Sequence, residues 1–94
     1  MNVIEHVKHR GLKRFIEHDD SRRLPHDLVE RIKYILTQLN AAEQIGDMNL
    51  HSFNLHELKG NRKGTWSVTV RANWRITFQF KEGNAWNVDL EDYH

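Results

Sequence analysis

The chain has 94 residues and a mass of 11.2 kDa, which suits one hydrophobic core, so we expect a single domain over residues 1–94. Nine residues are aromatic, which is too much anchoring surface for a disordered segment, and the lack of cysteine excludes disulfide frameworks, thiolate metal sites and cysteine nucleophiles. No stretch approaches the roughly 20 apolar residues of a membrane-spanning helix, so we expect a cytoplasmic protein with no membrane partner.

The formal net charge of +1 hides an uneven distribution of charged residues along the chain. Residues 59–81 hold six basic side chains and no carboxylate, whereas residues 82–94 hold four acidic ones. A basic stretch of this kind suits phosphate groups, although a solvated strand face would have the same composition. The six basic residues are Lys59, Arg62, Lys63, Arg71, Arg75 and Lys81.

The N-terminal half predicts a short strand and two helices. Residues 2–7 alternate as in a strand that joins the sheet. Apolar residues at helical spacing then predict an amphipathic helix over residues 8–18. The only proline, Pro25, suits the first turn of a second helix, whose apolar stripe extends to about residue 42.

The first predicted hairpin turns at residues 71–73. A two-residue loop there would set each apolar side chain beside a polar one, which a half-buried sheet does not sustain. A three-residue loop avoids this conflict and needs one residue in the left-handed conformation, a role we assign to Asn73. The resulting register pairs Val70 with Trp74, Val68 with Ile76 and Trp66 with Phe78.

The same reasoning places the second turn at residues 81–83, with Gly83 in the left-handed conformation. This register pairs Phe78 with Trp86, Ile76 with Val88 and Trp74 with Leu90. The predicted fold class is therefore α+β, a small antiparallel meander with two N-terminal helices packed on one face. The other face is predicted to be concave and polar, with Arg75 in mid-sheet between Thr69 and Asp89.

The sequence predicts no metal site, because its seven histidines show no HExxH spacing or facial triad with carboxylates, and no thiol is available. We expect no cofactor. The last residues, 91–94, follow directly on a predicted strand, which would hold proton-exchanging groups near an arginine. A strand that simply runs out into solvent would explain the same residues.

Four segments in combination resemble the HigB toxins of the RelE/ParE superfamily of toxin-antitoxin systems, over nearly the whole chain. The segments are Leu55-His56-Glu57-Leu58-Lys59-Gly60, Gly64-Thr65-Trp66-Ser67-Val68, Ala72-Asn73-Trp74-Arg75-Ile76-Thr77-Phe78 and Glu91-Asp92-Tyr93-His94. The resemblance implies a RelE-like fold and metal-independent, ribosome-dependent cleavage of messenger RNA. It also implies inhibition by a helix-turn-helix antitoxin, through which alone operator DNA would be contacted.

Carried over residue by residue, the resemblance implies an active site of His56, Lys59, Arg75, Asp92, Tyr93 and His94. RNA supplies its own nucleophile, the 2′-hydroxyl, so cleavage needs a base, an acid and cations around the phosphorane. Histidine can serve as either base or acid near neutral pH, which makes His56 and His94 the candidates for proton transfer. The order of their roles stays open at this point.

The remaining site residues have supporting roles under the same hypothesis. Asp92 would orient a histidine or act as base, and Tyr93 would donate a proton or stack on a nucleobase. Lys59 and Arg75 would stabilise the phosphorane, Arg75 through its planar fork. A structural ion pair of Arg75 with Asp89 would explain that arginine equally well. Glu57 departs from the family pattern, and a carboxylate beside the site histidine would alter its protonation.

Docking on the 70S ribosome would use basic residues outside the active site. These are Lys8, Arg10, Lys13, Arg14, Arg62, Lys63 and Arg71. Two other functions compete with the nuclease: a ParE-like toxin that poisons DNA gyrase without cleaving RNA, and an RNA-binding module without chemistry. His56 together with residues 92–94 favours the nuclease, because a binding-only protein has no need of groups matched for proton transfer.

Overall fold

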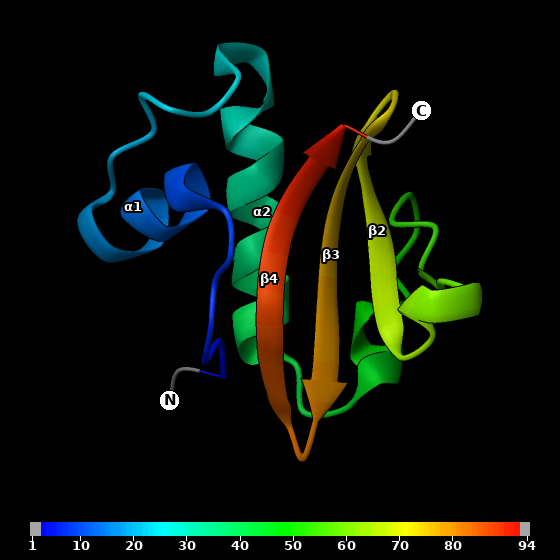
Figure 1. The fold of residues 1–94 in the computed structure, drawn as a ribbon. Helices are drawn as coiled ribbons and strands as arrows, with labels where there is room; N and C mark the ends of the chain where they lie inside the picture. The colour runs from blue at the N-terminus through cyan, green and yellow to red at the C-terminus, as the bar shows by residue number, and fades with distance from the viewer. Residues whose placement is uncertain (1–2, 93–94) are drawn as a thin grey trace.

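Two helices precede a four-stranded antiparallel sheet in the computed structural model, which describes residues 3–92 (Figure 1). The helices are α1 (Arg10–His18) and α2 (Val29–Ala41), and the 3-10 turns are η1 (His26–Leu28), η2 (Ile45–Met48) and η3 (Gly60–Arg62). The strands are β1 (His56–Glu57), β2 (Thr65–Arg71), β3 (Trp74–Lys81) and β4 (Asn84–Asp92), paired in the order β1-β2-β3-β4. The α+β meander predicted from the sequence is confirmed.

Both helices begin slightly later than predicted. Before α1, the Nδ1 atom of His9 accepts a hydrogen bond from the backbone N–H of Leu12 at 3.1 Å, so this side chain caps the helix. Asp19, in the left-handed conformation with a φ of 54°, ends it. Pro25 precedes η1, and the α-helical turns follow at Val29, because the first turn of the predicted helix is a 3-10 turn.

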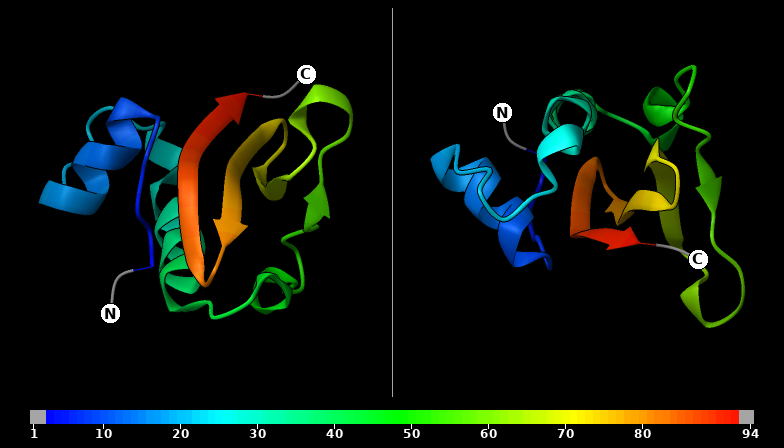
Figure 2. Two further views of the ribbon diagram at one scale, coloured as in Figure 1. Left: turned by 60° about the horizontal axis from the view of Figure 1, so that its bottom comes forward. Right: turned by 90° about the horizontal axis from the view of Figure 1, so that it is seen from above.

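The core lies between α2 and the sheet. α2 covers one face of the sheet, and α1 lies beside α2 beyond β4, as Figures 1 and 2 show. Among the described residues, the core side chains with no exposed surface include Leu12, Ile32, Ile35, Leu39, Met48, Phe53, Val68, Ile76, Phe78 and Val88. Within the same residues, no helix is long and apolar enough to span a bilayer.

The N-terminal segment joins the sheet, as its alternation predicts, but through isolated parallel bridges along β4. Ile4 bridges Ala85 and Val7 bridges Val88. Backbone N–H groups of Glu5 and Lys8 donate to the carbonyl groups of Ala85 and Val88 at 2.8 and 2.7 Å. The extended chain therefore covers the outer edge of β4 before α1 begins.

The first hairpin has a two-residue turn, with Arg71 opposite Trp74, so the predicted pairing of Val70 with Trp74 is wrong. An irregularity between Thr69 and Arg71 shifts the register, so that Val68 pairs with Ile76 and Trp66 with Phe78 as predicted. The left-handed residue is Ala72, with a φ of 52°, and not Asn73. A bulge thus resolves the conflict that the longer loop was meant to avoid.

The second hairpin departs further from the predicted register. Glu82 and Gly83 both have positive φ, 53° and 79°, as in the two-residue type I′ turn that matches strand twist. Gly83 is left-handed as predicted, but Gln79 faces Trp86, and a second irregularity then brings Ile76 opposite Leu90. The three predicted pairs, Phe78 with Trp86, Ile76 with Val88 and Trp74 with Leu90, are therefore wrong.

This second bulge decides which residues of β4 are buried. Ala85, Val88 and Leu90 lie in the core, whereas Trp86, predicted to be buried, is 39% exposed on the polar face. Asn87 has a φ of 53° and is the extra residue between Trp86 and Val88. Because Asn87 has no residue opposite it in the β3–β4 register, the side chain of Trp86 lies on the polar face of the sheet and not in the core.

Replacing Ala72 by glycine should stabilise the protein. An L-residue in the left-handed conformation is strained by about 1–2 kcal/mol, and the greater unfolded-state freedom of glycine offsets about half of the relief. We expect Ala72→Gly to raise the melting temperature by a few degrees in thermal unfolding followed by circular dichroism. Ala41→Gly, in the last turn of α2, should lower it; a lower melting temperature for Ala72→Gly would contradict the assignment.

Candidate active site on the polar face of the sheet

Alternation along the strands sets one row of side chains on the face away from α2. This row consists of Thr65, Ser67 and Thr69 of β2, Arg75, Thr77 and Gln79 of β3, and Trp86, Asp89 and Glu91 of β4. A pocket of about 200 Å³ opens on this face, lined by Lys8, Asn61, Arg62, Thr65, Thr77, Gln79 and Asn87. The polar face is therefore hollowed and has cations at its rim.

A bidentate ion pair crosses this face between Arg62 and Glu91. The Nη1 and Nη2 atoms of Arg62 donate to Oε1 and Oε2 of Glu91 at 2.9 and 2.7 Å, and the hydroxyl of Thr77 donates to the same carboxylate. The hydrogen bonds from Arg62 lower the pKa of Glu91, followed by the one from Thr77, although partial burial opposes the shift. The pair joins the two outer parts of the sheet, because Arg62 follows β1 and Glu91 lies near the end of β4; Figure 2 shows these segments approaching each other.

Arg75 lies half-buried in β3, opposite Thr69 on one side as predicted. Its neighbour on β4 is Glu91 and not Asp89, because the bulge moves Asp89 opposite Thr77. The guanidinium turns toward the β2–β3 turn, where Nη1 donates to the carbonyl oxygens of Ala72 and Trp74. Within residues 3–92, the predicted contact of Arg75 with Asp89 is replaced by these backbone contacts.

His56 is exposed on β1, opposite Ser67. Its Nδ1 atom lies 2.9 Å from the carbonyl oxygen of Asn54. A carbonyl oxygen only accepts, so we assign the proton to Nδ1, which leaves Nε2 of the neutral ring able to accept a proton. This orientation suits a general base.

A second pocket, of about 390 Å³, brings His56 and Lys59 together with Arg62. Its lining residues are His56, Glu57, Leu58, Lys59, Asn61 and Arg62. The carboxylate of Glu57 accepts a hydrogen bond from the backbone N–H of Gly64 at 2.9 Å, so it braces the loop between β1 and β2. The pocket therefore combines a proton acceptor with two cations.

Asp92 is the last described residue, exposed at the end of β4 and opposite Trp74 in the register. Tyr93 and His94, both predicted site residues, lie outside the described residues. The structure thus brings His56, Lys59 and Arg62 into one pocket. Arg75 lies on the same face of the sheet, and Asp92 ends β4, the strand farthest from β1 in the sheet order. Within residues 3–92, no three His, Asp or Glu side chains gather closely enough to bind a metal ion.

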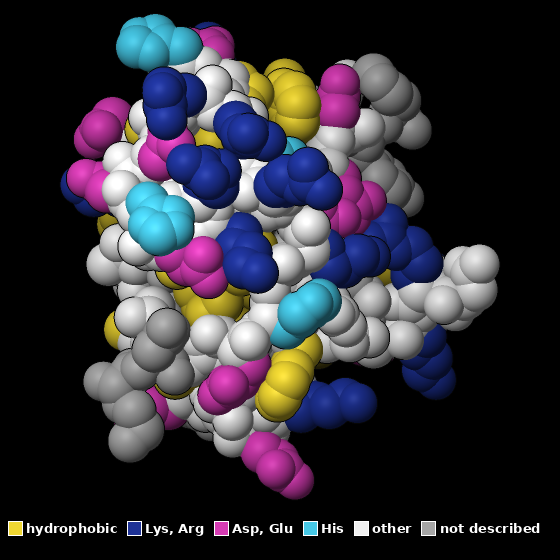
Figure 3. All heavy atoms as spheres, turned by 60° about the vertical axis from the view of Figure 1, so that its left-hand side comes forward, with side chains coloured by type: hydrophobic (Ala, Val, Ile, Leu, Met, Phe, Trp, Pro, Cys, Tyr) yellow, Lys and Arg dark blue, Asp and Glu magenta, His cyan; other side chains and the backbone are white. Residues whose placement is uncertain are grey.

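The predicted RNA-contacting residues of the N-terminal half lie in or next to α1. Figure 3 shows Lys and Arg side chains gathered on the face of the molecule that includes α1. Lys8, Arg10 and Lys13 are exposed there. Lys63 is also exposed. Arg71 forms an ion pair with Asp27, a residue distant in the sequence, at 3.4 Å.

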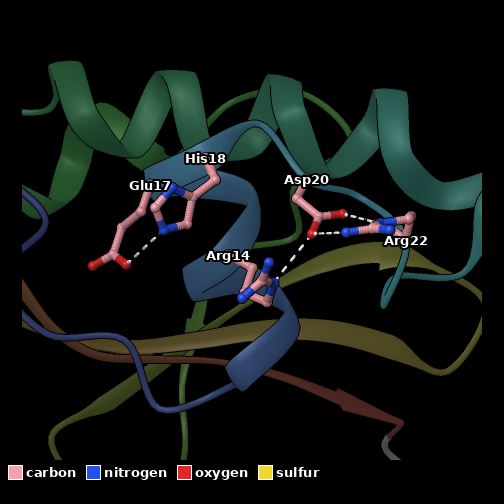
Figure 4. A network of polar contacts seen from close by, with 5 residues as sticks. All are labelled: Arg14, Glu17, His18, Asp20 and Arg22. Carbon is pink, nitrogen blue, oxygen red and sulfur yellow. Dashed lines mark hydrogen bonds and ion pairs between the residues drawn. The ribbon is translucent and has the colours of Figure 1, made fainter.

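Asp20 organises part of this basic face and was not singled out by the sequence pattern. Figure 4 shows its carboxylate between Arg14 and Arg22, at 3.1 Å from Nε of Arg14 and 2.9 Å from Nε of Arg22. Arg22 above all, with Arg14, holds the pKa of Asp20 well below its usual range. This carboxylate orients Arg14, which lies within α1, and Arg22, which follows it, and it offsets part of their positive charge.

The comparisons with known proteins assign the family. The profile described as "RelE-like toxin of type II toxin-antitoxin system HigB" matches residues 5–94. The chain belongs to the HigB-like toxin family. It is 47% identical to Endoribonuclease HigB of Proteus vulgaris over 92 residues, covering 98% of this chain and 100% of that protein. It is 33% identical to Toxin HigB-1 of Vibrio cholerae over 88 residues, covering 92% and 93% of the two chains.

The fold also matches a solved structure. The crystal structure of a YafQ variant from E. coli superposes with a TM-score of 0.61 at 15% identity, covering 98% of this chain and 93% of that one. Such a distant match shows the fold alone. The resemblance to HigB toxins predicted from the four sequence segments is confirmed, and membership of a type II toxin-antitoxin system implies an antitoxin partner.

Replacing Glu91 by glutamine should change the pH dependence of stability. Because the folded pKa lies below the ordinary value of 4.5, the carboxylate stabilises the fold above about pH 4.5, and this contribution is lost as pH falls through the folded pKa. We expect Glu91→Gln to lower the free energy of unfolding by about 1 kcal/mol at pH 7 and by less at pH 3.

The measurement is thermal unfolding at a series of pH values. The matched control is Asp89→Asn, on the same strand and face, whose carboxylate accepts a hydrogen bond from the backbone N–H of Leu90. This control should show a smaller change. A Glu91→Gln protein with the same pH profile as wild type would show that the ion pair contributes nothing to stability.

Proposed function

We propose that this toxin is an endoribonuclease that cleaves translated messenger RNA on the ribosome, by metal-independent attack of a 2′-hydroxyl on the adjacent phosphate. The endoribonuclease class rests on the family and on the 47% identity to a protein named as such. The observation that carries the mechanism is the pocket that His56 lines together with Lys59 and Arg62, while the Nδ1 atom of His56 contacts the carbonyl oxygen of Asn54.

His56 is the base in this mechanism. The carbonyl of Asn54 holds its Nδ1 proton in place, which orients the ring and leaves Nε2 to take the proton of the 2′-hydroxyl. The leaving 5′-oxygen must gain a proton as the bond to phosphorus breaks. We assign that role to the C-terminal residues, His94 first, with Asp92 orienting the donor and Tyr93 donating or stacking.

Cations stabilise the extra negative charge on the phosphorane. Lys59 is exposed in the same pocket as His56, and Arg75 offers a planar guanidinium from the start of β3, beside the β2–β3 turn. Arg62 has Glu91 as an ion-pair partner, so its net contribution to phosphate binding is smaller than that of Lys59. We therefore keep Lys59 and Arg75 as the catalytic cations.

We propose that ribosomal RNA is bound by the exposed Lys8, Arg10 and Lys13, by the half-buried Arg14 of the same face, and by Lys63 and Arg71. Each phosphate neutralised by a basic side chain makes the affinity fall with salt. The partner that silences the toxin would be a helix-turn-helix antitoxin, through which alone operator DNA would be bound. The site of action is then the cytoplasm, where ribosomes translate.

Induction of the toxin without an antitoxin should arrest growth and create new 5′ ends within translated frames of messenger RNA. His56→Gln should slow cleavage by about 10²-fold, the usual contribution of a general base, while keeping the wild-type melting temperature. Sequencing of RNA 5′ ends measures cleavage by the wild type and by the variant, and circular dichroism measures the melting temperature. Growth arrest with intact messenger RNA and trapped DNA gyrase would instead establish a ParE-like poison.

Blocking the nucleophile should abolish cleavage without abolishing binding. With a 2′-methoxy group at the scissile nucleotide, the hydroxyl that attacks phosphorus is gone, so ribosome-bound messenger RNA should remain intact. The same substitution one nucleotide downstream serves as the control and should leave cleavage measurable. Gel analysis of end-labelled RNA decides the matter, since cutting at the modified nucleotide would point to water as the nucleophile and reassign His56 and His94.

A further inference from the structure

Two large hydrophobic side chains are exposed among residues 3–92. Tyr34 on α2 is 49% exposed, and Trp86 on β4 is 39% exposed. Tyr34 packs edge to face against the ring of Phe53, with centroids 5.8 Å apart. Trp86 lies on the polar face of the sheet, opposite Gln79, at the end of β4 far from Glu91.

The outward position of Trp86 depends on the bulge. Simple alternation from Val88 and Leu90 would bury Trp86, so the extra residue Asn87 is what exposes it. Asn87 has a φ of 53°, in the left-handed region that asparagine tolerates better than most residues, so the sequence can supply this bulge at little cost.

Two hydrogen bonds hold the bulge from opposite sides. The amide nitrogen of Asn87 donates to Oε1 of Gln79 at 2.8 Å, and its amide oxygen lies 2.8 Å from Nδ1 of His6. The neighbouring strand and the N-terminal segment therefore both grip Asn87. The exposed tryptophan is a fixed feature of the sheet and not an accident of a flexible turn.

The surroundings of Trp86 suit a nucleobase. A pocket of about 380 Å³ is lined by Gln79, Lys81, Glu82, Asn84, Trp86 and Asn87. Amide side chains can hydrogen-bond the edge of an unpaired base whose face stacks on an aromatic ring. Gln79 and Asn87 also line the pocket that contains Lys8 and Arg62, so the two hollows share a wall.

The position along β4 sets which nucleotide Trp86 can reach. Trp86 lies opposite Gln79 and Glu91 lies opposite Arg75, so the two levels of the sheet are four residues apart along β3, roughly 13 Å. This distance is too long for Trp86 to contact the scissile phosphate beside Arg75. It suits a base that flanks the cleavage point on the same strand of RNA.

We propose that Trp86 is a stacking site for an unpaired base of the messenger RNA, one that flanks the scissile nucleotide, with Gln79 beside the edge of that base. The assignment rests on the proposed function, because it takes the polar face as the RNA-facing side. Messenger RNA is favoured over ribosomal RNA because the Trp86 pocket is linked to the proposed catalytic pocket. The Trp86 pocket adjoins the pocket of Lys8 and Arg62, and Arg62 also lines the pocket of His56. Trp86 is a binding residue and takes no part in proton transfer.

The test combines variants of Trp86 with abasic nucleotides in the messenger RNA. Trp86→Ala should raise KM for cleavage of ribosome-bound messenger RNA roughly tenfold, as expected for one lost stacking contact, with kcat little changed. Trp86→Phe should keep most of the affinity. An abasic nucleotide at one flanking position should weaken wild type by a similar factor and leave Trp86→Ala unaffected, since the shared contact is already gone.

Tyr34→Ala is the matched control, because it removes an exposed aromatic ring away from the polar face, and it should leave KM unchanged. Melting temperatures of all variants monitor folding. An unchanged KM for Trp86→Ala would overturn the proposal, as would abasic effects that add to those of Trp86→Ala. Weaker binding of Trp86→Ala to ribosomes without messenger RNA would assign the ring to ribosomal RNA and overturn it too.

A separate measurement does not depend on cleavage. A short single-stranded RNA with 2′-methoxy groups should quench tryptophan fluorescence of wild type more than that of Trp86→Phe. Failure of wild type to cut translated messenger RNA would refute the proposed function alone. Equal quenching of the two proteins would refute stacking at Trp86.

Discussion

Pairing of β3 on both sides is the constraint on which the rest of this structure depends. Ile76 and Phe78 of this strand are fully buried under α2, while Arg75 and Thr77 face the other side. Because side chains alternate strictly along a strand, each neighbouring strand must bring its own apolar residues into step with these two. Irregularities in both hairpins achieve this, and each leaves the polar face with a defined set of chemical groups.

The Arg62–Glu91 pair gives this polar face its second constraint. The proposed base and Lys59 belong to the outer strand β1 and the loop after it, whereas Asp92 belongs to β4 at the opposite edge. A bidentate pair is directional as well as attractive, so it fixes the spacing of these segments better than a single charge contact would. Its carboxylate also offsets the charge of Arg62 on the polar face, whereas other Lys and Arg side chains gather on the face that includes α1 (Figure 3).

The sequence predicted the class of fold and the approximate spans of β2, β3 and β4, but neither the short strand β1 nor how the strands align. Apolar periodicity identified α2 and the alternation of β2 and β3, because packing against one core enforces both patterns. The predicted registers are wrong at Val70 and at Trp86. A bulge adds one residue near each position, and the alternation of apolar and polar residues does not indicate where such a residue lies. Asp89 was placed beside Arg75 for the same reason, and the true neighbour, Glu91, was overlooked inside the Glu91-Asp92-Tyr93-His94 segment.

The long strands β4 and β2 are each covered on their outer side by a short segment of the chain. Residues 3–8 lie along β4, and residues 53–58 lie along β2 through hydrogen bonds such as Thr69 N–H to Phe53 and Leu58 N–H to Thr65. Each edge of the sheet is therefore formed by a short segment, which offers a second polypeptide only a short stretch of backbone for pairing. Short edge segments of this kind disfavour the joining of separate copies of the chain into a shared sheet, so the fold itself opposes aggregation through its strands.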